Sequence, residues 1–410
     1  MGYITRAMEP VVEQTMREYP ITLVTGARQV GKTTMLEHLV SQAGDTRERL
    51  TLDDLTLRDL AKNDPAMFFQ IHRPPLLIDE VQYAPELFGE MKLLVDAGAA
   101  AGSFLLTGSQ QFRLMELAGE SLAGRIAILS LPSLSQREIC GAPDAGPLPF
   151  EVDALRQRAK VSGPQTAPEV FSRIRQGTMP AVVSGERGNL SVFYGSYVQT
   201  YIDRDVRRLL GRVDALEFNA FLTSVAARCS QVLNVNAIAR DVEQRPEKIR
   251  AWLSVLEKSG IVFLLHPYSN NQLKRTVKAP KLFFDDSGLV AHLAKWTSPQ
   301  TMEAGAMSGA FIENYVVSEL RKGFLDAGEE APLYYYRDRD AREIDLVVER
   351  DGELHPIEIK KTASPNLAMT RSFTALDRAT TPRGIGAVVC MARDFGALDA
   401  QTLVVPIGML

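Results

Sequence analysis

Residues 26–34 read GARQVGKTT, and this stretch decides the fold of the first part of the chain. It fits the pattern G-x-x-x-x-G-K-[ST], follows the apolar strand-like run ITLVTG and precedes a helix expected from Lys32. Glycines in such a loop let backbone N–H groups curl around a β-phosphate, while Lys32 reaches the β- and γ-phosphates and Thr33 ligates Mg²⁺. The residues expected to bind ATP are Gly26, Ala27, Arg28, Gln29, Val30, Gly31, Lys32, Thr33 and Thr34.

Residues 76–82, LLIDEVQ, supply the acidic part of the same site. A buried strand leads to Asp79, whose carboxylate is expected to hold Mg²⁺ together with Thr33, and Glu80 follows as the residue that orients or deprotonates water. A third strand, SFLLTGSQQ, ends in Ser109, Gln110 and Gln111, and Gln110 is the candidate for γ-phosphate contact, although Ser and Gln also form ordinary turns. The motifs together predict Mg²⁺-dependent ATP hydrolysis.

The remaining organisation is that of a multidomain α/β protein. The chain has 410 residues, a net charge of −4 and a hydrophobic content of 45%, so any nucleic-acid site must be a local basic patch. Without an apolar run of eighteen residues or a signal-peptide pattern, we expect a cytoplasmic protein with no membrane partner. The expected units are an α/β nucleotide domain over residues 1–140, a Pro- and Gly-rich linker over 141–168, a helical region over 169–304 and an α/β domain over 305–410.

Residues 234–287 are typical of a winged helix. Two helices are expected over 234–242 and 246–260, followed by strand-like runs that flank the basic stretch NNQLKRTVKAP. The candidate DNA-binding residues are Lys248, Arg250, Lys274, Arg275 and Lys278. A wing of this composition favours backbone contact, and therefore shape or branched structure, over base reading. The alternative is a packing unit that forms a lid or docks a protein partner.

The C-terminal part carries a second set of carboxylates. EIDLVVER and LHPIEIKK are expected to pair as strands, and alternation along the second strand places Glu358 and Lys360 on one face. Asp345 stands on the neighbouring strand and Glu313 on the preceding helix. The order of a helix and three strands, with Asp345, Glu358 and Lys360, resembles the restriction-endonuclease-like fold and its metal-binding signature. Charged residues that alternate on a solvent-facing strand are the ordinary alternative.

Most of the chain resembles one group of proteins. GARQVGKTT, LLIDEVQ, TGSQQF and SLAGRIAILSL are similar to the bacterial and archaeal AAA-type ATPases with an uncharacterised C-terminal region, and SYVQTYIDRDVRRL and GAFIENYVVSEL are similar to that region. The resemblance implies an ATPase core, a helical segment with a winged-helix unit and a nuclease-like C-terminal fold. It also implies a homo-oligomer, such as a hexamer, in which Arg125 stabilises the transition state of ATP hydrolysis in a neighbouring subunit. The alternative is a surface arginine without such a role.

Three functions follow from these observations. The first is an ATPase that acts on DNA, with structured or branched DNA in repair or recombination as the first substrate to test. The second is a nucleotide-controlled switch that docks a protein partner and uses the nuclease-like domain as a scaffold. The third is a metal-dependent nuclease gated by ATP.

Overall fold

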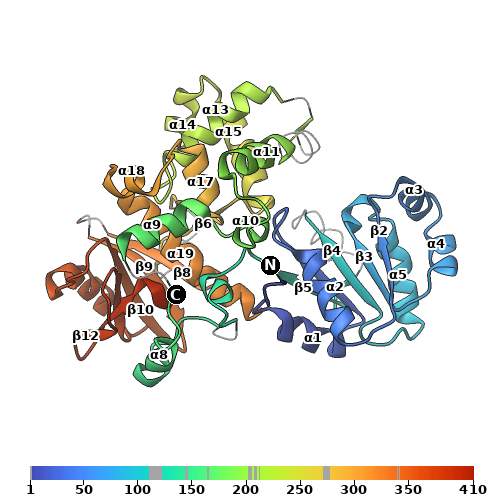
Figure 1. Cartoon of the computed structure of the whole chain (residues 1–410), viewed down its shortest axis with the longest axis horizontal. Coiled ribbons are helices and arrows are strands. Elements are labelled where there is room, and N and C mark those ends of the chain that lie inside the picture. The colour runs from blue at the N-terminus through green and yellow to red at the C-terminus, as the bar shows by residue number, and fades with distance from the viewer. Residues whose placement is uncertain are drawn as a thin grey trace.

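The protein has three lobes that meet at a common centre (Figure 1). The computed structural model describes residues 2–109, 122–143, 146–163, 166–201, 206, 210–211, 213–270, 278–338, 340 and 342–410. We name the lobes by their place in the chain: the N-terminal lobe (residues 2–140), the helical lobe (167–304) and the C-terminal lobe (308–410). In Figure 1 they lie at the right, at the top and at the left, respectively.

The N-terminal lobe is built on a five-stranded parallel sheet with the strand order β2-β3-β4-β1-β5. Its strands are β1 (Ile21–Thr25), β2 (Glu48–Thr51), β3 (Leu76–Asp79), β4 (Phe104–Gly108) and β5 (Ile126–Ser130). The helical elements of the lobe are α1 (Glu9–Glu18), α2 (Lys32–Gln42), α3 (Leu55–Asn63), α4 (Pro65–Ile71), η1 (Val81–Tyr83), α5 (Leu87–Asp96) and α7 (Gln136–Ile139).

Both faces of this sheet are covered, which explains why β1 and β4 are buried along their whole length. One apolar cluster joins α1 and α2 to the sheet, and a second joins α4 and α5 to it. The parallel α/β core predicted from the alternation of strand-like and helical segments is therefore confirmed. Because parallel strands point the same way, their carboxyl ends share one edge, where the P-loop and the residues after β3 and β4 meet.

The helical lobe packs around aromatic side chains. Trp252 on α15 contacts Phe218 and Phe221 on α13, with ring centroids 5.2 and 5.1 Å apart. Its helices are α9 (Ala167–Gln176), α10 (Pro180–Val183), α11 (Leu190–Tyr201), α13 (Ala215–Ala226), α14 (Val235–Asp241), α15 (Pro246–Lys258), α17 (Ser287–Leu293) and α18 (Pro299–Ala304). An antiparallel hairpin of β6 (Val262–Leu265) and β7 (Lys281–Phe284) follows α15, so the predicted order of two helices and two strands is present.

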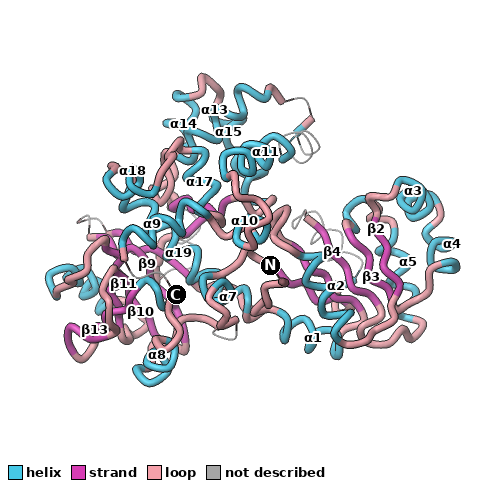
Figure 2. Tube along the Cα trace, viewed as in Figure 1, coloured by secondary structure: helices cyan, strands magenta, loops and turns pink. Residues whose placement is uncertain are grey.

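The C-terminal lobe contains a mixed six-stranded sheet with the order β12-β13-β11-β10-β9-β8 (Figure 2). β8, β9 and β10 are antiparallel neighbours, whereas β10, β11 and β13 run parallel. The elements are α19 (Ser308–Asp326), β8 (Leu333–Arg337), β9 (Glu343–Arg350), β10 (Glu353–Lys360), η3 (Leu367–Arg378), β11 (Gly386–Cys390), β12 (Gly396–Asp399), β13 (Thr402–Pro406) and η4 (Ile407–Met409). The helical segment η3 is a 3-10 helix.

The connection between the first two lobes differs from a simple linker. Within residues 141–168, α8 (Val152–Arg158) forms and lies against the C-terminal lobe. Arg158 Nε donates to the carbonyl of Met409 at 2.8 Å, and the Phe150 ring stacks on His355 at 3.9 Å. The high Pro and Gly content indicated a loose connection, but buried Leu148, Phe150 and Leu155 fix the segment in place.

The three lobes share one apolar core. A single cluster of buried residues runs from Val30 of the P-loop through the β6–β7 hairpin to α19 and the C-terminal sheet. In the described parts of the chain, no helix has the length and apolar character required to cross a membrane.

Candidate functional site

The P-loop turns from the end of β1 into the first residue of α2. Gly26 and Gly31 have φ values of 147° and 93°, which side chains rarely allow. A Cβ at Gly26 would also lie 2.2 Å from the carbonyl oxygen of Leu131. Both positions therefore require glycine, and the loop they form exposes the N-terminal end of α2 to the cavity beside it.

Lys32 is held inside this loop. Its Nζ donates to the carbonyl oxygens of Gly26 at 3.1 Å and Ala27 at 2.8 Å, and only 6% of the residue is exposed. These contacts fix the ammonium group among the backbone groups that surround a bound phosphate in a P-loop. The ammonium group of Lys32 therefore lies within the P-loop.

Thr33 and Asp79 meet at the carboxyl edge of the sheet. Thr33 Oγ1 donates to Asp79 Oδ1 at 2.7 Å, and the Thr107 hydroxyl donates to the same oxygen. The pairing of Ile78 with Leu106 between β3 and β4 brings Asp79 beside Thr107. A hydroxyl and a carboxylate are hard oxygen ligands of the kind that Mg²⁺ prefers, so this donor pair fits the metal.

Glu80 follows Asp79 with a left-handed backbone, at φ 57°. Its N–H donates to Thr107 Oγ1 at 3.2 Å, and its carboxylate accepts hydrogen bonds from Gln82 Nε2 and, at 3.5 Å, from Ser109 Oγ. A non-glycine residue rarely adopts this conformation unless its surroundings impose it. The turn directs Glu80 toward the cavity that the P-loop lines.

That cavity has a volume of about 640 Å³ and is lined by two lobes. The helical lobe contributes Pro180, Ala181 and Ser184, and the segment before α1 contributes residues 2–4 and Arg6. The lining P-loop residues are Arg28, Gln29, Gly31, Lys32, Thr33 and Thr34. Of the other predicted nucleotide-binding residues, Gly26 and Ala27 line a separate cavity behind the loop, and Val30 is buried in the core.

Arg6 is a buried support of the P-loop that the sequence analysis missed. Its guanidinium donates to the carbonyls of Val30 and Pro132, each at 2.8 Å, and pairs with Glu138 at 2.9 Å. Glu138 also closes a capping box with Ser135 at the start of α7. The pattern Ser-x-x-Glu in SQRE could have indicated that helix start, but nothing local indicated Arg6 as its partner.

Of the other predicted nucleotide-site residues, one cannot be placed and one lies away from the cavity. Gln110 lies outside the described residues, although Ser109 beside it does contact Glu80. Arg125 precedes β5 and pairs with Asp96 at 2.7 Å. The parallel register of β1 and β5 puts Arg125 at the opposite edge of the sheet, on the order of 15 Å from the P-loop. A role for Arg125 across a subunit interface stays a prediction.

The predicted DNA-binding cations of α15 make contacts inside the lobe. Lys248 Nζ lies 2.6 Å from a Glu217 carboxylate oxygen and over the Trp252 ring, and Arg250 pairs with Glu247 at 3.5 Å. Lys274 and Arg275 fall outside the described residues, whereas Lys278 is exposed just before β7. Two of the described candidate cations are thus in ion pairs on α15, and the third is exposed before β7.

The four predicted residues of the C-terminal lobe do come together. Lys360 Nζ lies 2.6 Å from Glu358 Oε1 and 3.4 Å from Asp345 Oδ2, and the N–H of Ile359 donates to Asp345 at 2.9 Å. Glu313 reaches the same region from α19. We call the set Glu313, Glu343, Asp345 and Glu358, with Lys281 and Lys360, the acidic cluster.

Lys281 and Glu343 are members of the acidic cluster that the sequence analysis missed. Lys281 Nζ lies 2.9 Å from Glu313 Oε1 and 2.6 Å from Glu343 Oε1. Lys281 belongs to β7 of the helical lobe, so no spacing in the sequence connects it with the cluster. Glu343 lies two residues before Asp345, and the alternation along β9 could have indicated it.

Burial and mutual repulsion perturb the acidic cluster. Burial, followed by the charge of Asp345, raises the pKa of Glu358 to about 7, and burial raises the pKa of Glu313 to about 7 against the charge of Lys281. Among the described residues, no three acidic, histidine or cysteine side chains are arranged to hold one metal ion. Carboxylates are suitable ligands for a divalent metal ion, but the carboxylates of the acidic cluster are paired with Lys281 and Lys360.

The parallel sheet, P-loop, Asp79 and Glu80 define a P-loop nucleotide-binding domain. Three family models match the chain: an AAA domain over residues 18–140, and two domains of unknown function, DUF8612 over 168–300 and DUF4143 over 308–410. The first match supports an AAA-type ATPase. The descriptions of the other two families carry no activity.

Two mycobacterial proteins are similar over most of the chain. The uncharacterized proteins Rv2008c of Mycobacterium tuberculosis and Mb2031c of Mycobacterium bovis are each 27% identical over 367 residues. The alignment spans 89% of this chain and 76% of each relative. Their descriptions give no function that could be transferred.

Solved structures with distant similarity include a Walker-type ATPase and a branch migration motor. The Walker-type ATPase PABY2304 of Pyrococcus abyssi has a TM-score of 0.44 and 16% identity, over 71% of this chain and 96% of its own. The RuvB Holliday junction branch migration motor of Thermotoga maritima has a TM-score of 0.30 and 14% identity, over 62% and 88% of the two chains. At these scores, no property of either protein is transferred to this chain.

Proposed function

We propose that the protein is a Mg²⁺-dependent ATPase whose N-terminal lobe hydrolyses ATP. The observation that carries the proposal is the hydrogen bond of 2.7 Å between Thr33 and Asp79. Thr33 lines the cavity together with Lys32 and Glu80. The Thr33 hydroxyl, the Asp79 carboxylate, the Lys32 ammonium group and Glu80, the candidate general base, thus lie at one edge of one sheet.

Each of these side chains has one role in the proposed reaction. Lys32 and the backbone N–H groups of the P-loop bind the phosphates, and Thr33 and Asp79 would hold Mg²⁺, which would neutralise negative charge on the phosphates. Glu80 accepts a hydrogen bond from water and orients it toward the γ-phosphate. Gln82 and Ser109 position the Glu80 carboxylate through their hydrogen bonds.

The proposed target of the ATPase cycle is DNA, with structured or branched DNA tested first. The support is the order of α14, α15 and the β6–β7 hairpin, together with the partly exposed cations Lys248 and Arg250. Their side chains are 40% and 61% exposed, and exposed ion pairs of this kind contribute about 0–1 kcal/mol. Lys248 and Arg250 could therefore leave Glu217 and Glu247 and bind DNA phosphates at a small cost in free energy.

Two other functions have an observation in their favour. The internal pairing of Lys248 and Arg250 favours a nucleotide-controlled switch that docks a protein partner. The buried carboxylate oxygen Glu358 Oε2, which has no hydrogen-bond partner, favours a metal-dependent nuclease gated by ATP. A homo-oligomer, a hexamer included, belongs to the first proposal through Arg125, and light scattering with and without ATP tests it.

The test is a phosphate-release assay with and without Mg²⁺, alone and with single-stranded, duplex and branched DNA. We expect Mg²⁺-dependent turnover that DNA stimulates and that Lys32→Ala abolishes. Lys62→Ala, a substitution of an exposed lysine on α3, is the matched control and should retain turnover. Turnover that survives Lys32→Ala would overturn the ATPase assignment, whereas turnover that no DNA changes, with no DNA binding, would overturn only the proposed target.

A further inference from the structure

The side chain of Lys281 extends from the helical lobe into the C-terminal lobe. It is the first residue of β7 in the helical lobe, yet its side chain, 4% exposed, ends between Glu313 on α19 and Glu343 on β9 of the C-terminal lobe. A side chain of the helical lobe therefore places a positive charge among carboxylates of the C-terminal lobe.

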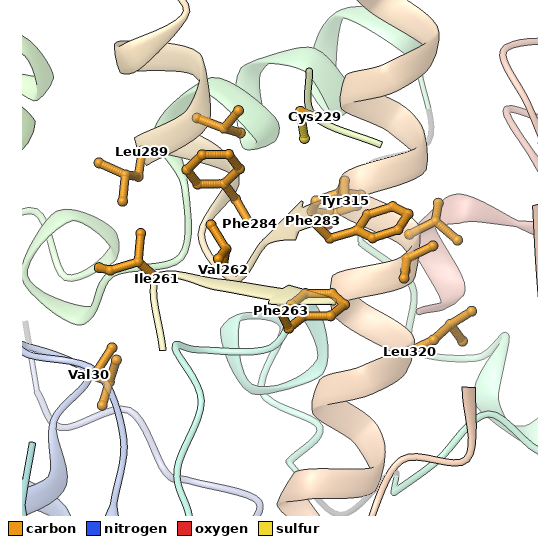
Figure 3. Close-up of a cluster of buried hydrophobic side chains, with 14 of the residues drawn as sticks. Val30, Cys229, Ile261, Val262, Phe263, Phe283, Phe284, Leu289, Tyr315 and Leu320 are labelled. Carbon is orange, nitrogen blue, oxygen red and sulfur yellow. The ribbon is translucent and has the colours of Figure 1, made fainter. Parts of the chain in front are cut away.

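The hairpin that carries Lys281 is docked on α19. Figure 3 shows Phe263 and Phe283 of the hairpin on the side of Tyr315 and Leu320 of that helix, whereas Phe284 points toward Leu289 of α17. The amide of Asn314 closes the contact, because its Oδ1 accepts from the N–H of Phe284 at 2.7 Å and its Nδ2 donates to the carbonyl of Phe284 at 3.2 Å. Asn314 is adjacent to Glu313, so the position of the hairpin determines whether Lys281 reaches its partners.

The acidic cluster contains more carboxyl groups than ammonium groups even in this docked state. Lys281 lies between Glu313 and Glu343, and Lys360 lies between Asp345 and Glu358. The half-exposed guanidinium of Arg337 lies farther away, 3.9 Å from Glu343. Glu358 is 7% exposed, and its Oε2 has no hydrogen-bond partner. A buried carboxylate oxygen without a partner is costly, and a cation is the ligand that would satisfy it.

We propose that Lys281 is an interdomain lock on a divalent-cation site: its ammonium occupies the acidic cluster while the β6–β7 hairpin is docked, and a divalent cation takes the carboxylates when the hairpin withdraws. The proposal rests on the acidic cluster being a cation site and does not depend on ATP hydrolysis. A cation site occupied by Lys281 is consistent with the finding that no three metal-ligating side chains within the described ranges are arranged around one ion.

The physical basis is competition between a tethered and a free cation. A lysine fixed next to its partners competes at a high effective concentration, which weakens the binding of a divalent ion from solution. Burial lowers the pKa of Lys281, but the charge of Glu313 and hydrogen bonds to Glu343 and Glu313 raise it above its ordinary value. The side chain therefore carries its charge as long as it stays in place.

The test measures Mn²⁺ binding by electron paramagnetic resonance in nucleotide-free, full-length protein that carries Asp79→Asn to remove the P-loop metal site. We expect Lys281→Met to lower the dissociation constant for Mn²⁺ at least ~10-fold, because the competing ammonium is gone. Adding Glu358→Gln to Lys281→Met should cancel the gain, since a ligand of the cation is lost.

Two controls separate the loss of this particular charge from general effects. Lys281→Arg keeps the charge and should leave Mn²⁺ affinity at the parental value. Lys62→Met removes the charge of an exposed lysine on α3 of the N-terminal lobe and should also leave Mn²⁺ affinity unchanged. Lys281→Gln, which retains hydrogen bonding to the carboxylates, serves if the methionine variant does not fold.

The proposal is overturned if a folded Lys281→Met or Lys281→Gln protein binds Mn²⁺ no more tightly than its parent. It is also overturned if the gain persists with Glu358→Gln. If neither neutral variant folds, wild-type protein decides: saturating Mn²⁺ should raise deuterium uptake in residues 281–284, and unchanged uptake contradicts the lock. None of these outcomes bears on phosphate release at the P-loop.

Discussion

The nucleotide site and the acidic cluster contain the same kinds of side chains but differ in how those side chains are paired. At the nucleotide site, Lys32 donates to backbone carbonyls, which leaves the Asp79 carboxylate to hydroxyl groups. In the acidic cluster, both lysines bind carboxylates directly. The first site also opens into a cavity of about 640 Å³.

This comparison indicates that residue type alone does not define a metal site. Hydroxyl donors hold a carboxylate in position while leaving its charge available to a cation, whereas an ammonium group neutralises it. We therefore propose that the nucleotide site accepts Mg²⁺ in this arrangement, whereas the acidic cluster accepts a cation only when a lysine moves. Matched substitutions in the two regions test this distinction.

The largest effect is expected from exchanging one carboxylate for an amide in each region. Glu80→Gln should lower the ATPase rate by ~10²- to ~10⁴-fold, because a general base is lost, while ATP binding is retained. Glu358→Gln should change the rate less than ~2-fold, because Glu358 lies in another lobe. Phosphate release under saturating ATP measures both, and a comparable loss in the two variants would show that the regions act as one catalytic unit.

A second, smaller effect concerns the buried support of the P-loop. Arg6→Met leaves the Glu138 carboxylate buried without its cation and should reduce the free energy of unfolding by about 3–5 kcal/mol. Arg125→Met breaks an ion pair whose side chains are 32% and 43% exposed, and should cost less than about 1 kcal/mol. Chemical denaturation compares the two, and equal losses would contradict the role assigned to Arg6.

The smallest effect is a pH dependence at the far end of α19. Burial, reinforced by the charges of Glu138 and Glu319, raises the pKa of Asp326 well above its ordinary value, and its Oδ1 has no hydrogen-bond partner. The unfolded chain releases this proton near pH 4, whereas the folded chain retains it to higher pH, so the free energy of unfolding falls as the pH rises above about 4.

Asp326→Asn removes this titration and should be more stable than the wild type by at least about 1 kcal/mol at pH 8, with the difference shrinking toward pH 4. Asp153→Asn, at a side chain 93% exposed on α8, is the control and should show no such trend. Thermal unfolding between pH 4 and pH 8 measures both. A less stable Asn variant throughout that range would show that the carboxylate is ionised in the fold.

The sequence was sufficient where a site is contiguous or lies at the end of a recognisable strand. GARQVGKTT, Asp79 and Glu80 are within two short motifs, and the parallel core that unites them is confirmed. Thr107 could not be assigned, because its contact with Asp79 depends on β3 and β4 being neighbours. Arg6 and Lys281 act across 132 and 32 residues, respectively, and only tertiary packing brings them to Glu138 and Glu313.

The most direct test of the distinction between a metal-ready and a locked site is the number of Mn²⁺ ions bound with a non-hydrolysable ATP analogue. Electron paramagnetic resonance should count one tightly bound Mn²⁺ per chain, weakened by Asp79→Asn and unchanged by Glu358→Gln. A second tight Mn²⁺ that Glu358→Gln removes, or a single Mn²⁺ unaffected by Asp79→Asn, would contradict the account.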